Sequence, residues 1–243
     1  LGTTSGVLVA AGGTLDLNGQ SVDRNLTSIV GVGHEGNGAL INSSSTTATL
    51  TGTFVLGSYA RIGGSGDITI NNAGGITGNL LLTKFGNGTL RVVSAAASAR
   101  TGTNQIDEGT LRLEAATGFA PIGTGAMALN GGTLSLGFDT SGLVGGVVNL
   151  LADSTIITDR ASSGDGGIVS SLSTLTIGGS KLTVKAGDNV TSGQIGLTLG
   201  STFIGGAMLA GGNPVFDVLS TANATTTLTL GTLTDQAIAP RTI

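Results

Sequence analysis

A short segment of the form Gly-Thr-apolar-x-apolar recurs along this chain, and it constrains the fold more than any other feature. Copies of the segment, some with one position changed, occupy residues 12–17, 64–70, 86–92, 107–113, 130–136, 152–157 and 172–177. The apolar residues that we expect to point inward follow one another at 22, 21, 23, 22, 19, 22 and 21 residues. They are Ile68, Leu90, Leu111, Leu134, Ile156, Leu175, Leu197 and Val218. A repeat of this length predicts a solenoid with one coil per repeat.

The composition fits short strands joined by tight turns. Gly accounts for 44 of the 243 residues, whereas charged residues make up 10% and aromatic residues 3%. Most apolar residues alternate with polar ones, as in strands that have one buried face. Leu90 and Val92 share one face of such a strand, and Thr89 and Arg91 share the other. Arg112, which lies one repeat later, is expected next to Arg91 on the surface.

We therefore predict an all-β fold, a parallel β-helix of about 22 residues per coil and roughly 11 coils. Strands of successive coils would pair in parallel at roughly 4.8 Å, so that stability is shared between neighbouring coils. The spacing is less regular in residues 1–63 and 219–243, which could be irregular coils or a separate domain. Because the composition does not change there, we favour a single β-helix segment over residues 1–243.

Charge and cysteine content exclude several classes of partner. The formal net charge is −4 and the ten basic residues are scattered, so no basic stripe is available for nucleic acid. Cys is absent, which removes disulfides and thiolate metal sites. No apolar run is long enough for a transmembrane helix. The chain starts without Met or a signal sequence, so we expect it to be part of a longer exported polypeptide.

Residues 82–113 resemble the passenger-associated repeat of bacterial autotransporters. Leu82, Lys84, Gly86, Gly88, Thr89 and Leu90 match the first half of that repeat, and Gly109, Thr110, Leu111 and Leu113 match the second. The resemblance implies a right-handed parallel β-helix, exported and displayed on or released from the surface of a Gram-negative-type bacterium. The translocator barrel of that family is not recognisable here, so it either lies downstream in a longer precursor or does not exist for this protein.

The motifs that could carry chemistry each have a simpler explanation. Residues 31–36 match G-x-G-x-x-G, but no helix is expected after them, and the single histidine, His34, lacks further metal ligands nearby. One isolated GDGG at 164–167 predicts a turn and not a calcium site. Thr-rich strands at 172–176 and 225–229 could form an ice-binding face only if the pattern continued over several coils. We assign no catalytic, cofactor-binding or metal-binding residue, and we expect no cofactor.

Three functions remain open at the level of the sequence. The first is a non-enzymatic structural or adhesive scaffold at the cell surface, with self-association or contact with other surface components. The second is a carbohydrate-active β-helix enzyme such as a polysaccharide lyase or hydrolase, which needs several charges converging in a groove. Its candidates are Asp153, Asp159, Arg160, Asp165, Lys181, Lys185 and Asp188. The third is an adhesin for a carbohydrate or host-surface ligand, for which Tyr59, Phe119 and Phe138 are the aromatic candidates.

Overall fold

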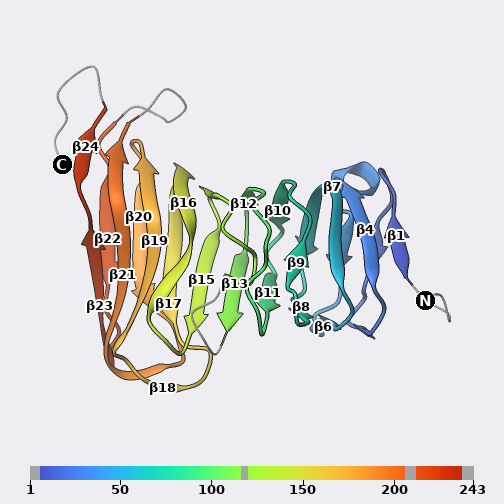
Figure 1. The fold of residues 1–243 in the computed structure, drawn as a ribbon, viewed down its shortest axis with the longest axis horizontal. Coiled ribbons are helices and arrows are strands. Elements are labelled where there is room, and N and C mark those ends of the chain that lie inside the picture. The colour runs from blue at the N-terminus through green and yellow to red at the C-terminus, as the bar shows by residue number, and fades with distance from the viewer. Residues whose placement is uncertain (1–5, 116–119, 206–211, 237–243) are drawn as a thin grey trace.

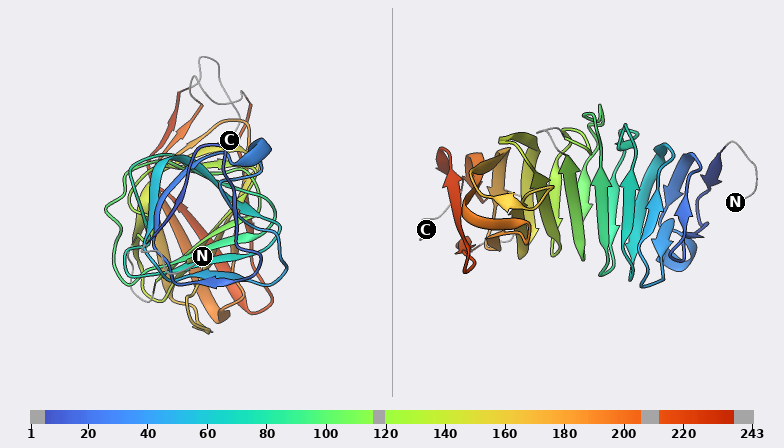
Figure 2. Two further views of the ribbon diagram at one scale, coloured as in Figure 1. Left: turned by 90° about the vertical axis from the view of Figure 1, so that its right-hand side faces the viewer. Right: turned by 90° about the horizontal axis from the view of Figure 1, so that it is seen from below.

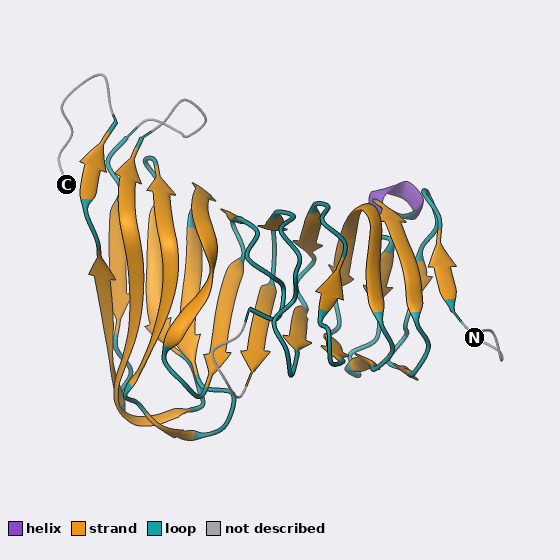
Figure 3. Cartoon of the chain, viewed as in Figure 1, coloured by secondary structure: helices purple, strands orange, loops and turns teal. Residues whose placement is uncertain are grey.

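The structure, a computed structural model, describes residues 6–115, 120–205 and 212–236. Within these residues the chain is an all-β parallel solenoid, as predicted, with its strands stacked coil on coil along one axis (Figure 1). The described part contains one helical segment, the 3₁₀ turn η1 (His34–Gly36), shown in purple in Figure 3. No helix among the described residues is long and apolar enough to span a membrane.

One side of the solenoid is a nine-stranded sheet, with its strands side by side along the axis (Figure 2). Each coil contributes one strand to it. The strands are β3 (Ser21–Val22), β6 (Ala48–Leu50), β8 (Ile68–Asn71), β11 (Thr89–Val93), β13 (Thr110–Ala115), β15 (Thr133–Phe138), β17 (Ser154–Asp159), β20 (Lys181–Ala186) and β22 (Val215–Leu219).

The remaining strands belong to a 15-stranded sheet that forms the rest of the wall. They are β1 (Val7–Val9), β2 (Leu15–Asp16), β4 (Leu26–Gly31), β5 (Leu40–Asn42), β7 (Phe54–Gly64), β9 (Ile76–Thr77), β10 (Leu82–Phe85), β12 (Asn104–Ile106), β14 (Met127–Asn130), β16 (Gly142–Ala152), β18 (Gly164–Asp165), β19 (Ile168–Ile177), β21 (Val190–Ile204), β23 (Ala224–Leu230) and β24 (Leu233–Asp235). Long strands turn a corner: β7 pairs with β9 at its start and with β5 at its end.

The glycines of the repeat form the corner before the nine-stranded sheet. Gly86 and Gly109 have φ of 68° and 60°, a region that side chains disfavour. A Cβ atom on Gly109 would lie 2.3 Å from the carbonyl oxygen of Gly86, one coil away. The glycines therefore recur because corners of successive coils stack with their backbones in close contact.

The interior is one continuous apolar core that follows the axis. Alternate residues of the strands supply it: in β11, Leu90 and Val92 are buried whereas Thr89 and Arg91 are partly exposed. A second, smaller cluster lies in the C-terminal coils and consists of Ile168, Ala186, Val190, Ile195 and Ala224.

The predicted coil length and coil count are corrected by the strand register. In the central coils the steps are those expected, since Ile68 pairs with Leu90 and Leu90 with Leu111. Towards the C-terminus Ile156 pairs with Val184, and Val184 with Val218, steps of 28 and 34 residues. The solenoid thus has about 8 turns of about 24 residues. The later coils are longer because β18 is inserted at a corner and the second cluster widens the interior.

The inward ladder is corrected for the same reason. The first five residues, Ile68 to Ile156, are buried and in register on β8, β11, β13, β15 and β17. Leu175 and Leu197 are also buried, but they lie in the 15-stranded sheet, because 19 residues after Ile156 do not complete the longer coil. Val184 occupies the sixth position of the ladder. Val218 follows it on β22 but is 40% exposed, because no described strand covers β22.

Candidate functional site

The densest group of charged side chains lies on the outer side of the nine-stranded sheet. Arg91 and Arg112 are register partners on β11 and β13, which confirms that they are neighbours one coil apart. Glu114 accepts a hydrogen bond from the Nε of each arginine, both at 2.9 Å. Burial raises the pKa of Glu114, but the hydrogen bonds and charges of the two arginines outweigh this and hold the pKa below its ordinary value of 4.5. Glu114 therefore offsets the repulsion between the stacked arginines.

Arg112 also ties β13 to the end of β17, two coils further on. Its Nη1 lies 2.6 Å from Oδ2 of Asp159 and 3.0 Å from Oγ of Ser135, and its Nη2 donates to the carbonyl of Arg160 at 2.8 Å. Asp159 is only 4% exposed. Burial lowers the pKa of Arg112, but the hydrogen bonds to Asp159 and Glu114 outweigh this and raise it. The guanidinium thus links three coils from outside the core.

A groove of about 510 Å³ runs beside this network, along the ends of several strands of the same sheet. Two carboxylates, Glu114 and Asp139, are in its wall. Asp139 accepts the backbone N–H of Ser162 at 3.1 Å and lies 3.5 Å from Nε of Arg160. The groove is otherwise lined by Asn71, Asn72, Ala73, Val93, Ser94, Ala95, Ala115, Ala161 and Ser162. Charges do converge in a groove here, but both carboxylates are already engaged by arginines.

The charged residues proposed as an enzyme site come together only in part. Asp159 and Arg160 both belong to the network around Arg112, whose remaining members sequence reasoning did not connect. Asp165 lies on the β18 excursion, where Ser192 and Thr191 donate to its carboxylate. Four further candidates are exposed and lie outside the network: Asp153, Lys181, Lys185 and Asp188.

The other sequence motifs do not build a site among the described residues. His34 is exposed on η1, with Nε2 at 3.7 Å from Oε1 of Glu35. No group of three potential metal-ligating residues occurs in the described part of the chain. A turn and β5 follow residues 31–36, which lack the helix that phosphate binding requires. Of the aromatic candidates, Phe138 is buried in the core, Tyr59 is 49% exposed, and Phe119 lies outside the described residues.

Lys84 has a role that the sequence did not reveal. Its side chain is fully buried, and its Nζ donates to the carbonyls of Phe85, Gly86 and Glu108 at 2.8, 2.6 and 3.1 Å. Burial lowers the pKa of Lys84 to about 8. The lysine of the recurring Leu-x-Lys-x-Gly pattern thus holds together the glycine corners of two successive coils.

Replacing Lys84 by Met is expected to lower the free energy of unfolding by about 2 kcal/mol, because three backbone carbonyls lose their donor. The native pKa of about 8 is below the ordinary 10.5, so the folded state carries a desolvation cost that disappears as the amine loses its proton. The stability of the wild type should therefore rise relative to Lys84→Met between pH 8 and 10.5. Urea unfolding at pH 7 and 9.5 measures both effects, with the exposed Lys185→Met as the matched control. An equal loss in the two variants would contradict the role of Lys84.

Arg100 is a second buried cation that no sequence signal identifies. It is 2% exposed and donates to the carbonyls of Leu80 and Thr103 and to Oδ1 of Asn104. Burial lowers its pKa to about 10. Its Nε and the Nδ2 of Asn104 have no partner among the described residues. The guanidinium serves as a cross-brace of the corner between β10 and β12.

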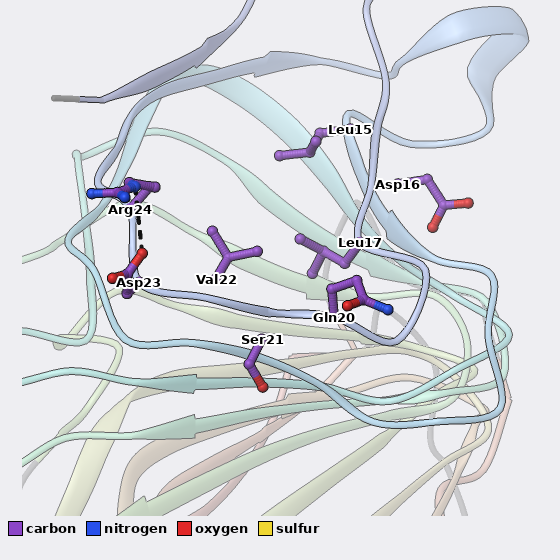
Figure 4. Close-up of a pocket in the computed structure, with 8 residues that line it drawn as sticks. All are labelled: Leu15, Asp16, Leu17, Gln20, Ser21, Val22, Asp23 and Arg24. Atoms are coloured by element: carbon purple, nitrogen blue, oxygen red, sulfur yellow. Dashed lines mark ion pairs between the residues drawn. The ribbon is translucent and has the colours of Figure 1, made fainter. Parts of the chain in front are cut away.

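The N-terminal coil leaves the interior open at one end. A pocket of about 390 Å³ there is lined by the side chains drawn in Figure 4, where Leu15, Leu17 and Val22 point into the interior. Asp23 and Arg24 form an ion pair of 3.4 Å on its rim. The pocket is the apolar interior of the solenoid seen from its end.

These features define a β-solenoid whose densest polar network is internally paired. Comparison with protein-family models, with curated proteins and with solved structures finds no match to this chain. The resemblance of residues 82–113 to autotransporter passengers stays a prediction.

Proposed function

We propose that this chain is a non-enzymatic structural scaffold, a right-handed β-helix segment of an exported bacterial surface protein. The observation that carries the proposal is the state of the end coils. The last described strands expose apolar side chains, with Val215 at 50%, Val218 at 40% and Leu219 at 45%. Leu8, on the first strand, is 65% exposed. Exposed apolar residues on unpaired strands favour contact with further β-structure.

The geometry of a solenoid makes such contact directional. All coils run in the same sense, so the C-terminal strands of one unit are already parallel to the N-terminal strands of a unit stacked beyond them. The contact surfaces differ at the two ends, which makes the association head-to-tail and open-ended. The stacked unit is a further coil of the same polypeptide or a second copy, and in either case load passes along the axis through backbone hydrogen bonds.

The passenger-like pattern of residues 82–113 supports export to the cell surface, and it has a structural counterpart. Its two halves form β10, β11 and β13, and its glycines and Lys84 form the corner between coils. We accordingly place the protein outside the cell, at the outer membrane or released from it.

End-to-end association is tested by sedimentation velocity and negative-stain imaging over a range of concentrations. We expect the wild type to form assemblies that lengthen with concentration, and the double variant Val218→Lys, Leu219→Lys to remain monomeric. The control, Leu143→Lys with Val169→Lys, changes exposed apolar residues on the lateral wall and should assemble like the wild type. Short monomers of the wild type at every concentration would contradict the association.

A carbohydrate-active enzyme is the second candidate, because Glu114 and Asp139 line one groove. A general acid needs a pKa raised towards neutrality. The pKa of Glu114 is lowered instead, by Arg91 and Arg112 acting against burial, which favours the scaffold. Release of reducing or unsaturated sugars from acidic or neutral polysaccharides would favour the enzyme.

A further inference from the structure

The threonine of the recurring segment forms a row across the outer side of the nine-stranded sheet. The register pairs Thr89 with Thr110, Thr110 with Thr133, Thr133 with Thr155, and Thr155 with Thr183. We call these five residues the threonine row. They lie on five successive coils at a spacing of about 4.8 Å, so the row is about 19 Å long and parallel to the axis.

The hydroxyl groups of the threonine row are available to a ligand. All five residues are partly exposed, and within the described residues none of their hydroxyls has a hydrogen-bond partner. Other threonines are engaged: Thr14, Thr77 and Thr227 each donate to a backbone carbonyl. The repetition of Thr in the segment is thus not explained by a bond within the protein, although its high strand propensity contributes.

The charged side chains that flank the row are directed to partners of their own. On one side Arg91 and Arg112 bind Glu114 and Asp159. On the other side Glu108 accepts the backbone N–H of Gly86, and Asp153 accepts that of Lys181. The groups left for a ligand are uncharged hydroxyls, each with one donor and two acceptor sites, beside a methyl group.

The row has defined ends. Asp67 precedes it and accepts the backbone N–H of Thr89 at 2.7 Å, and Asp217 follows Thr183 in the register. Carboxylates at both ends, with no free cation in the row, disfavour an anionic polymer. A peptide strand needs a sheet edge for its backbone, whereas the row lies on a sheet face.

We propose that the threonine row is a binding surface for a neutral polysaccharide whose chain lies along the solenoid axis. A sugar polymer presents hydroxyl groups at regular intervals, and these can donate to and accept from successive threonines. The methyl groups contact the apolar faces of the sugar rings. Ordered water on the same row, as in an ice-binding face, is disfavoured because Arg91, Arg112, Glu108 and Asp153 interrupt the surface on both sides. This proposal does not rest on end-to-end association.

The test removes three hydroxyls while keeping side-chain shape and strand propensity. The row variant carries Thr110→Val, Thr133→Val and Thr155→Val, and the matched control carries Thr174→Val, Thr198→Val and Thr229→Val in the 15-stranded sheet. The probes are suspended cellulose, chitin and an insoluble β-1,3-glucan, with bound protein measured by depletion. Circular dichroism and sedimentation establish that both variants fold and associate like the wild type.

We expect the wild type to bind at least one of the three probes. The row variant should bind it at least about tenfold more weakly, and the control variant within about twofold of the wild type. Absence of wild-type binding to all three probes, or equal binding by the row variant, would overturn the proposal. Thermal hysteresis that the row variant loses, without polysaccharide binding by the wild type, would assign the row to ordered water and also overturn it.

Discussion

Replacing Leu111 by Asp is expected to destabilise the protein by more than about 4 kcal/mol, enough to unfold the central coils. Leu111 is fully buried and lies in register between Leu90 and Leu134. The variant removes the apolar contacts to both neighbours and places a carboxylate where no donor is available. Because each coil rests on the next, the loss should spread along the axis and appear as a lower urea midpoint and reduced β-signal in circular dichroism.

Thr110→Asp is the matched control for this variant. It introduces the same side chain one residue earlier on β13, but on the outer side of the sheet, where Thr110 is partly exposed. We expect its free energy of unfolding to stay within about 1 kcal/mol of the wild type. Equal destabilisation by the two substitutions would contradict the inward orientation of Leu111.

The sequence predicted the wall of the solenoid best where the repeat is most regular. From Ile68 to Ile156 the spacing of apolar residues matches the register, because strand alternation and glycine corners are local properties. Beyond Ile156 the prediction chose Leu175 where the structure has Val184. Both are buried and apolar, so no local pattern distinguishes them; the choice depends on the eight additional residues that include β18.

The surface features were predictable only as far as neighbouring coils are equivalent. The contact between Arg91 and Arg112 follows from a single repeat step, and it was predicted. The contact of Arg112 with Asp159 spans 47 residues and was not. The threonine row was missed because threonines were sought along single strands such as 225–229, whereas the row runs across strands. Register converts a repeated residue into a surface, and register is a property of the whole fold.

Replacing Arg112 by Met is expected to lower the free energy of unfolding by about 3 to 4 kcal/mol, although Arg112 is not a core residue. The side chain of Asp159 is only 5% exposed, and it would lose its ionic partner at 2.6 Å. Glu114 would keep Arg91 alone. Urea unfolding at pH 7 measures the loss. The control is Arg24→Met, since Arg24 pairs with Asp23 at 3.4 Å in an exposed position and should contribute less than about 1 kcal/mol.

The pH dependence distinguishes a loss of charge pairing from a loss of packing. Arg91 and Arg112, acting against burial, lower the pKa of Glu114 below 4.5, so the ionised carboxylate contributes stability above pH 4.5 that is lost as the pH falls through its native pKa. Arg112→Met removes part of this contribution in advance. The difference in stability between wild type and variant should therefore shrink as the pH falls below 4.5. If the difference stays constant down to pH 3, Arg112 stabilises the coils by packing of its side chain and not by joining Glu114 and Asp159.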